Sequence, residues 1–484
     1  MLKFIVMKQL IFILFILYGI SNQTAAQQNW TAVPCSSMRN VEAFNWMFID
    51  SLHNEIILNS NNSYTICNTT FKGLVAYNGS GFHSLDKGVN THDSSNPGNG
   101  GAAMIACIPF RGQTLFGGSF YSVGTNTLFA KSIATWNGTV WDTFPKRCFS
   151  PVPNNSSGGG FYGFLKWLGK LWMYGGFDTI GNTITKNLTA YDGNTFIPVP
   201  TMPASDYQPI VKAIIYKDKF IASGNFDNYP NTTLSRVAQF DGTTWSSLGT
   251  GVLGNLSGVF DMAIYKDTLY IAGAFPKSAG NAGNYIMKWD GTQLRDAGFG
   301  GFCGYGSIQS LVQFRNRLYA FGNFQCAAGE KAFGVAYLEN GIWTVPQDSI
   351  ENNSITGAVA FKDAIYICGG FNSINGDNTI RKFAKMTCPD FDAAAGCVSG
   401  MNESSKTLDI KIFPNPTNDK IHLEFEQNRA MDKVSITNAL GQEVYMLLKP
   451  EPNKEIDISH LTKGIYLLQV NVGGTMQSYK IIKQ

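Results

Sequence analysis

One phrase recurs along this chain at an almost constant interval, and it constrains the fold more than any other feature. The phrase is an apolar strand pattern, a short polar turn, a second apolar strand pattern and then Gly-x-Phe, as in Leu269–Phe275. Its copies end at Phe120, Phe177, Phe226, Phe275, Phe324 and Phe371, in steps of 57, 49, 49, 49 and 47 residues. A near-constant period of this length indicates that one structural unit is repeated.

A second phrase follows the first in most units and carries an aromatic residue or leucine at its end. The best-defined copy is Val237–Trp245. Its relatives are Ile133–Trp141, Leu188–Phe196, Ile286–Leu294 and Val335–Trp343. An earlier copy, Val75–Phe82, follows a degenerate first phrase at Glu55–Ser60, which brings the number of units to seven.

Each unit therefore offers four short strands. In the best-defined unit they are predicted at 211–216, 219–223, 236–240 and 244–248, joined by the short turns Lys217-Asp218 and Asp241-Gly242. Four strands in 40–50 residues are typical of one propeller blade. Isolated hairpins could not bury a face, whereas radial closure protects every sheet edge. The sequence predicts an all-β protein whose residues 27–398 form a seven-bladed β-propeller.

The two ends of the repeat region complement each other. The last unit has strand patterns near 357–361, 364–368 and 380–385 and then lacks its Trp-bearing fourth strand. The segment that begins at Trp30 resembles the one that begins at Trp343. We predict that Trp30–Val33 completes the seventh blade. Six blades with a separate N-terminal cap remain the alternative.

The Gly-x-Phe and Trp positions resemble those of kelch-type and galactose-oxidase-like propellers. Residues Trp245–Val252 also resemble repeats of fungal cell-surface propellers. The resemblance covers residues 30–387 and implies a fold. It implies no particular function, because propellers host many unrelated sites.

The first 26 residues have the pattern of a secretory signal peptide. Lys3 and Lys8 precede the apolar run Leu10–Tyr18, and small residues lead to a cleavage site after Ala26. The apolar run is shorter than the roughly 20 residues that a membrane span needs. The sequence predicts a cleaved signal and no transmembrane segment in the mature chain.

A different domain is predicted after the linker 399–408. Residues 409–484 contain no Cys or Trp, and seven short alternating runs predict a small Ig-like β-sandwich. The motif prolines, Pro414 and Pro416, fix φ and suit a strand end. Gly441 and Gly464 are expected in turns that require a positive φ.

The strings Ile412–Pro416, Asn438–Tyr445, Ile458–Tyr466 and Lys480–Lys483 are similar, in this order, to the C-terminal sorting domain of the type IX secretion system of Bacteroidetes. The resemblance implies export by that machinery, via the periplasm, and cleavage of the domain within the linker. The protein would then be secreted or attached to the outer-membrane surface. The residues that match the sorting motif are Pro414, Asn415, Pro416, Gly441, Gly464 and Tyr466.

Nine cysteines, none in a CxxC pair, favour disulfides in an exported protein over a zinc site. Three pairs are predicted, Cys35–Cys67, Cys303–Cys326 and Cys388–Cys397. Cys107 with Cys148 is a weaker pairing, which leaves Cys368 free.

No catalytic motif stands out in the sequence. His53, His83 and His92 fall at different strand positions and are expected to be solvated, so we predict no metal and no cofactor. A net charge of +3 argues against nucleic acid as a partner.

The connections between second and third strands, and between one unit and the next, are the long ones. They are expected on one face, with enlarged loops at 86–102 and 149–160. Loops on a rigid scaffold commonly carry function. The predicted ligand-binding residues on this face are Tyr121, Asp178, Asp227, Tyr229, Lys277 and Asn281.

The function predicted first is non-catalytic binding of a glycan or another extracellular polymer. The alternatives are a carbohydrate-active enzyme with its site at the channel mouth, or an adhesion or structural protein whose partner is another surface protein. The enzyme would need two converging carboxylates, which a sequence alone cannot place.

Overall fold

The structure, a computed structural model, describes residues 29–33, 43–86, 88–90, 103–120, 122–124, 128–130, 132–144, 148–149, 160–180, 183–200, 209–224, 226, 235–254, 258–300, 306–352, 354–387, 410–425, 433–438, 443–448, 455–472 and 475–484. All regular structure in these residues is β, apart from the one-turn 3-10 helix η1 (Lys277–Ala279). The described residues include no helix that is long and apolar enough to cross a membrane.

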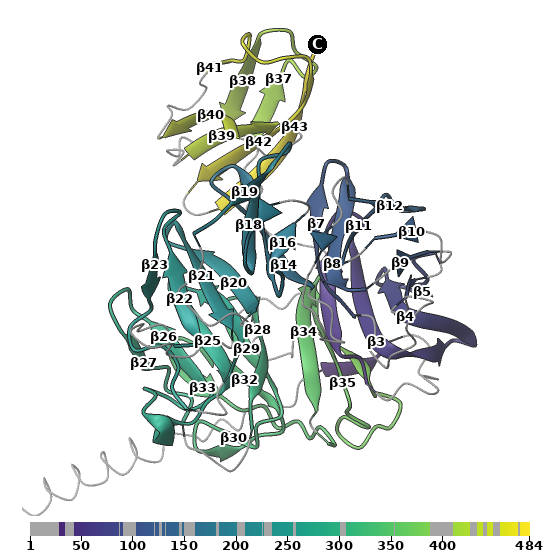
Figure 1. The fold of residues 1–484 in the computed structure, drawn as a ribbon, viewed down its shortest axis with the longest axis vertical. Helices are drawn as coiled ribbons and strands as arrows, with labels where there is room; N and C mark the ends of the chain where they lie inside the picture. Colours follow the sequence, from purple (N-terminus) through teal and green to yellow (C-terminus); the bar gives the residue numbers. More distant parts are fainter. Residues whose placement is uncertain are drawn as a thin grey trace, which may run out of the picture.

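Seven four-stranded antiparallel sheets follow one another between residues 29 and 387 (Figure 1). Sheet I contains β2 (Trp46–Asp50), β3 (Glu55–Ile66), β4 (Thr69–Tyr77) and β5 (Phe82–His83), and sheet II contains β7 (Ala103–Phe110), β8 (Gln113–Ser119), β11 (Ile133–Trp136) and β12 (Trp141–Thr143). Sheet III contains β14 (Phe161–Trp167), β15 (Lys170–Gly175), β18 (Leu188–Tyr191) and β19 (Phe196–Pro198), and sheet IV contains β20 (Ile210–Tyr216), β21 (Lys219–Gly224), β22 (Val237–Phe240) and β23 (Trp245–Ser247). Sheet V contains β24 (Gly258–Tyr265), β25 (Thr268–Ala274), β26 (Ile286–Trp289) and β27 (Leu294–Asp296), and sheet VI contains β28 (Ile308–Phe314), β29 (Arg317–Gly322), β32 (Val335–Glu339) and β33 (Ile342–Thr344). Sheet VII contains β34 (Ile355–Phe361), β35 (Ala364–Gly369), β36 (Phe383–Thr387) and β1 (Asn29–Ala32).

The first strand of each sheet, here called its inner strand, packs beside the inner strand of the next sheet. The contacts run in the order β2, β7, β14, β20, β24, β28 and β34, and β34 returns to β2. Figure 1 shows the same return, with the green strands β34 and β35 beside the purple strand β3. The first and last sheets are therefore neighbours.

Sheet VII is assembled from both ends of this region. Strand β1 pairs antiparallel with β36, with Trp30 opposite Met386. The Trp30 side chain is buried in one apolar cluster with Ile365 and Ile367 of β35. The prediction that Trp30–Val33 supplies the missing fourth strand is confirmed for β1.

Close packing explains the glycine of the Gly-x-Phe phrase. A Cβ added to Gly273 would lie 1.9 Å from the carbonyl oxygen of Gly258 on the inner strand of the same sheet. The corresponding glycines of four other sheets, Gly175, Gly224, Gly322 and Gly369, would meet an inner-strand or preceding carbonyl at 2.0–2.2 Å. The phenylalanine two residues later is buried, as at Phe275. Glycine is thus required where two strands approach too closely for a side chain.

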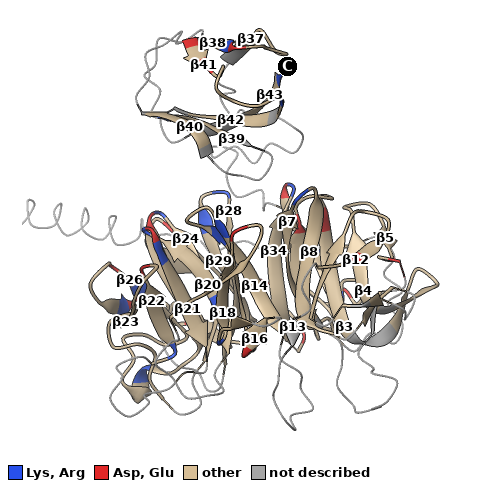
Figure 2. Ribbon diagram, turned by 45° about the horizontal axis from the view of Figure 1, so that its top comes forward, with Lys and Arg blue, Asp and Glu red and all other residues tan. Residues whose placement is uncertain are grey.

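The predicted strands of the best-defined unit agree with β20 to β23 within two residues at either end. The turn residues Lys217 and Asp218 both have positive φ, 46° and 59°, as a two-residue hairpin of this hand requires. Arg236 was expected inside a strand but adopts φ 57°, so the third strand begins at Val237. Figure 2 shows charged residues mainly at such turns, while most of the strand length is tan.

The turn between third and fourth strands is held by a side chain that accepts backbone hydrogen bonds. In sheet IV the Asp241 carboxylate accepts from the amides of Thr243 and Thr244, both at 2.8 Å. Asp192 does the same in sheet III, and the amide oxygens of Asn78 and Asn137 do it in sheets I and II. These hydrogen bonds hold the pKa values of Asp192 and Asp241 below the ordinary value.

We expect the double variant Asp192→Asn/Asp241→Asn to lose less thermal stability in acid than the parent protein. A carboxylate with a lowered pKa stabilises the fold above its unfolded pKa of about 3.9. That contribution disappears as the pH falls through the folded-state pKa. Asparagine keeps the turn, as Asn78 shows, and does not titrate. Melting temperatures measured from pH 7 to pH 2 test this. The reciprocal variant Asn137→Asp should steepen the acid loss, and an unchanged slope in both would contradict it.

Side chains beside the first turn of one sheet donate hydrogen bonds to backbone carbonyls of the next sheet, and we call these bonds latches. The Tyr265 hydroxyl of sheet V donates to the carbonyl of Asn316 in sheet VI at 2.6 Å. Lys362 of sheet VII donates to the carbonyl of Asn78 in sheet I at 2.8 Å. The last of these latches joins the end of the repeat region to its beginning.

Three small sheets lie within the connections that were expected to be long. They are β6 (Val89–Asn90) with β9 (Ser122–Val123) and β10 (Leu128–Phe129), then β13 (Cys148–Phe149) with β16 (Thr179–Ile180) and β17 (Thr183–Ile184), and finally β30 (Cys326–Ala327) with β31 (Glu330–Lys331). Since β6 pairs with β9, a connection between sheets lies beside a second-to-third connection.

The C-terminal strands form two sheets around a core of their own. One contains β37 (Ile410–Phe413), β38 (Lys420–Phe425) and β41 (Glu455–Asp457), and the other contains β39 (Lys433–Asn438), β40 (Glu443–Leu448), β42 (Gly464–Val472) and β43 (Thr475–Lys483). Ile421 and Ile456 of the first sheet share an apolar cluster with Val434 and Leu468 of the second. All seven strands predicted for this segment are present.

Candidate functional site

A β-bulge recurs near the start of the inner strand in six of the seven sheets. At each bulge the inner strand has one residue more than its partner strand. The extra residues are Ile105, Tyr162, Val211, Phe260, Gln309 and Thr356, and they recur in the same steps as the Gly-x-Phe phrase. A bulge redirects the side chain of its extra residue, which is why bulges are frequent beside binding sites.

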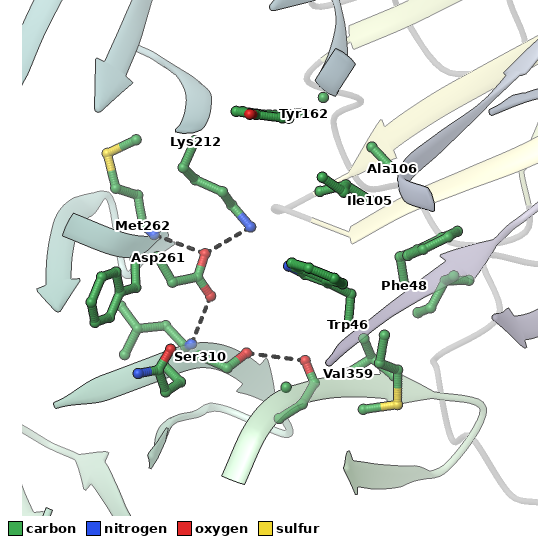
Figure 3. Close-up of a pocket in the computed structure, with 18 of the residues that line it drawn as sticks. Trp46, Phe48, Ile105, Ala106, Tyr162, Lys212, Asp261, Met262, Ser310 and Val359 are labelled. Atoms are coloured by element: carbon green, nitrogen blue, oxygen red, sulfur yellow. Dashed lines mark hydrogen bonds and ion pairs between the residues drawn. The ribbon is translucent and has the colours of Figure 1, made fainter. Parts of the chain in front are cut away.

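These extra residues all line one cavity of about 860 Å³, together with Trp46 at the start of β2. Figure 3 labels Trp46, Ile105 and Tyr162 among the lining residues. All seven inner strands contribute to the lining. The side chains of Trp46 and Phe260 are both 37% exposed, although aromatic residues elsewhere in the repeats are mostly buried. The cavity therefore presents accessible aromatic surface.

An ion pair lies on the wall of this cavity. Lys212 Nζ of β20 is 2.8 Å from Asp261 Oδ1 of β24, and Figure 3 shows both side chains among the lining residues. Asp261 also accepts from the backbone amides of Met262 and Leu311, at 2.9 and 2.8 Å. The Asp261 carboxylate raises the pKa of the Lys212 ammonium, which therefore stays protonated.

Polar side chains of the cavity wall join neighbouring inner strands. Asp261 links β20 to β28 through Lys212 and Leu311. Ser310 of β28 donates to the carbonyl of Ala358 in β34 at 3.1 Å. Cys107 Sγ of β7 lies 3.1 Å from the carbonyl of Ile49 in β2 and can donate to it. The wall is thus held by bonds between sheets, which fixes the positions of the groups that face the cavity.

The residues predicted from the loops are not brought together by the described structure. Tyr121, Asp227 and Tyr229 lie outside the described residues. Asp178 lies beside the small sheet of β13, β16 and β17 and is partly buried. Lys277 is exposed in η1 and pairs with Asp296 at 3.3 Å.

Asn281 has a structural role. Its side chain is buried, accepts from the amide of Leu253 at 2.9 Å, and donates to the carbonyls of Leu253 and Pro276, also at 2.9 Å. Because this side chain is buried and both of its amide donors are used within the protein, Asn281 does not belong to the proposed binding surface. The prediction from the sequence selected loop residues and missed Lys212, Asp261 and the six bulge residues, which lie on strands.

The histidines differ in their surroundings. His83 lies on the fourth strand of sheet I and pairs with Glu55 at 2.6 Å. His53 lies in the first turn of sheet I, as predicted, but its side chain is 22% exposed and its Nδ1 is 2.7 Å from the buried Asp50 carboxylate. The expectation of a solvated His53 is wrong, because Asp50 also accepts from the hydroxyl of Thr114 and holds this turn inside the structure. His92 lies outside the described residues. In the described part of the chain, no three His, Cys, Asp or Glu side chains converge as metal ligands.

The cysteines fall into two groups. Cys67 and Cys326 are disulfide-bonded, and their predicted partners, Cys35 and Cys303, lie outside the described residues, as do Cys388 and Cys397. The thiols of Cys107 and Cys368 are free. The weaker pairing of Cys107 with Cys148 is therefore wrong, since the Cys107 thiol faces Ile49 on the cavity wall. The Cys368 thiol is free, as predicted, and burial raises its pKa to about 12.

The motif residues of the C-terminal segment hold its last strand. Pro414 and Pro416, both preceded by cis peptide bonds, directly follow β37, at the strand end where they were expected. Asn415 between them accepts a hydrogen bond from the amide of Ile482 in β43 at 2.9 Å. The Tyr466 hydroxyl donates to the carbonyl of Thr462 at 2.8 Å.

The two motif glycines have different outcomes. Gly464 was expected in a turn with a positive φ, and that expectation is wrong. The residue begins β42, is paired with Lys483, and does not adopt a positive φ, because it already belongs to the sheet ladder. Gly441 and the predicted cleavage site at Ala26 lie outside the described residues.

A family model decides the nature of this segment. The model of the secretion system C-terminal sorting domain matches residues 411–484. Residues 411–484 are a type IX sorting domain. The sorting domain implies export, so the protein is released from the cell or held at its surface. Its direct partner during export is the type IX secretion machinery.

Solved structures with low sequence identity resemble the chain. The extracellular domain of a putative one-component system from B. thetaiotaomicron matches over 96% of this chain, with 10% identity and a TM-score of 0.43. The chain spans 59% of the length of that domain. A fungal alcohol oxidase of the AA5 family, in complex with copper, matches over 94% of this chain and 100% of its own, with 11% identity and a TM-score of 0.42. No curated protein sequence matches the chain.

Proposed function

We propose that the protein is an exported, non-catalytic binding protein whose residues 27–398 form a seven-bladed β-propeller. The seven sheets would be its blades, sheet VII would be closed by β1, and residues 409–484 would be an Ig-like sandwich that serves export. The cyclic order of inner-strand contacts and the latch from Lys362 to Asn78 support this arrangement.

The ligand we propose is a glycan, and the repeated bulge carries this proposal. Six bulges and Trp46 surround one cavity with redirected side chains, two of them aromatic residues with accessible faces. The apolar C–H face of a sugar ring packs on an aromatic face, while its hydroxyls hydrogen-bond to the few polar groups of such a site.

The bulge residues lie at the long-loop end of the cavity, whose lining continues along the inner strands to Gln313 and Ala360. Each bulge residue lies within the first three residues of its inner strand, directly after the connection from the preceding sheet. The enlarged segments 86–102 and 149–160 were predicted on that face, and most of their residues lie outside the described part of the chain. The position of the bulge residues agrees with the face chosen from the loop lengths and moves the binding residues from the loops to the strands.

The enzymatic alternative receives less support from the same lining. Glycoside hydrolysis generally uses a pair of carboxyl groups that flank the scissile bond. Among the described residues that line the cavity, Asp261 is the single carboxylate, and Lys212 and two backbone amides already occupy it.

We expect the variants Trp46→Ala and Phe260→Ala to weaken glycan binding about tenfold each, since truncating an aromatic anchor commonly costs 1–2 kcal/mol or more. The full chain would be tested against a panel of neutral and acidic polysaccharides, followed by calorimetry on those that bind. Ile342→Ala, which trims an apolar side chain that is 70% exposed on β33 of sheet VI, is the control and should bind normally. A folded protein that binds no glycan, or binding that both aromatic variants retain, would overturn the proposal.

A further inference from the structure

We propose that the glycan carries a carboxylate, as a uronic acid does, and that Lys212 binds this group inside the cavity. The inference rests on the proposed function, because it names the class of glycan that the same cavity takes. Two observations carry it: the exposure of Lys212, the only cation among the described lining residues, and the three protein donors that already contact its acidic partner Asp261.

The two members of the ion pair differ in their access to the cavity. The Lys212 side chain is 42% exposed, whereas the Asp261 side chain is 9% exposed. A ligand that enters therefore reaches the ammonium more readily than the carboxylate. Both side chains line the cavity, and the ammonium is the more exposed of the two charged groups.

Asp261 is largely satisfied within the wall, because three donors of the protein already contact its carboxylate. Its Oδ1 accepts from Lys212 and from the amide of Met262, and its Oδ2 accepts from the amide of Leu311. A lysine ammonium has three N–H donors, and the contact with Asp261 uses one of them. The remaining donors are strong partners for an anionic oxygen, because charge-assisted bonds are about twice as strong as neutral ones.

The surroundings favour a single anionic group over a densely charged ligand. Of the six bulge residues and Trp46, five are apolar or aromatic and the other two are the neutral Gln309 and Thr356. A sugar ring would contact the aromatic faces while its carboxylate reaches Lys212. Within a protein cavity an ionic contact is stronger than in bulk water, because the effective dielectric constant is lower.

Matched polymers provide the test. Polygalacturonate, alginate and hyaluronan would each be compared with the same polymer after reduction of its carboxyl groups, so that the members of a pair differ only in the anionic group. We expect the full chain to bind at least one acidic polymer about tenfold more tightly than its reduced form, and to lose this preference in Lys212→Met. The reduced form should bind Lys212→Met and the parent protein equally.

Three further variants keep the result interpretable. Lys212→Arg retains the charge and should retain the preference. Lys219→Met removes an equivalent charge from the exposed position on β21 and should change nothing, which separates the cavity from general attraction of polyanions. Lys212→Met/Asp261→Asn removes both charges, in case the lone carboxylate impairs folding of the single variant.

The possible failures are distinguishable. Equal binding of acidic and reduced polymers by the parent protein, or a preference that persists in Lys212→Met, would overturn the carboxylate site and leave glycan binding intact. Binding of neither member of any pair would overturn the proposed function together with the inference.

Discussion

The variant Trp30→Ala should lower the free energy of unfolding by about 3–5 kcal/mol, the usual cost of truncating a buried tryptophan. Trp30 is 8% exposed and belongs to the apolar cluster that joins sheets VI and VII. Its indole nitrogen has no hydrogen-bond partner, so the loss would come from apolar packing. Urea denaturation of the full chain measures it.

The neighbouring residue provides the control. Thr31 is exposed on the same strand, and its hydroxyl makes one long contact with the carbonyl of Lys385 at 3.4 Å. Thr31→Ala should change stability by no more than about 0.5 kcal/mol. Equal effects of the two substitutions would show that β1 does not complete sheet VII.

The variant Gly273→Ala should destabilise the protein by about 3 kcal/mol, the upper end of the usual cost of overpacking. The new methyl group would lie 1.9 Å from the carbonyl oxygen of Gly258 and 2.9 Å from the Cα of Val259. Both atoms belong to backbone and cannot move aside as a flexible side chain would. Thermal and urea denaturation would measure the loss.

Gly81→Ala is the matched control for this prediction. A Cβ at Gly81 would meet nothing within 4 Å, so the same chemical change should be almost neutral there. If Gly273→Ala were equally neutral, the close approach of β24 and β25 would not be the reason for the glycine. Because Gly258 begins the strand that bulges at Phe260, a folded Gly273→Ala protein should also bind glycan more weakly.

Strands and turns could be predicted from the sequence because their signals are local. Alternation with a period of two gives the strands, and dipeptides such as Lys217-Asp218 mark the turns. The pairing of β1 with β36 was also predictable, since Trp30 and Trp343 begin similar segments. Nothing local predicts how closely two paired strands approach, so the reason for the repeated glycine needed the structure.

The candidate site was mostly missed because a bulge breaks the alternation that sequence reasoning relies on. In the run Ile210–Tyr216, Lys212 resembles an ordinary solvent-facing residue of a strand. The extra residue Val211 shifts the register, and Lys212 faces the cavity instead. A signal was present: aligning the units on Gly-x-Phe places Tyr162, Phe260 and Gln309 at the same position. Without knowledge of the bulge, however, the sequence does not predict toward which side the side chain at that position points.

The pairing of Asn29 with Thr387 also has a kinetic consequence. The paired residues are 358 positions apart in the chain, so β1 can pair with β36 only after the whole repeat region has been synthesised. The entropy of closing so long a loop makes such contacts slow to form. Until then, β36 presents an open edge to other chains. Strand β1 has only four residues, and Asn29 and Thr31 are exposed. A strand this short and polar can form few contacts with an incorrect partner strand. The brevity of β1 thus limits mispairing before it reaches β36.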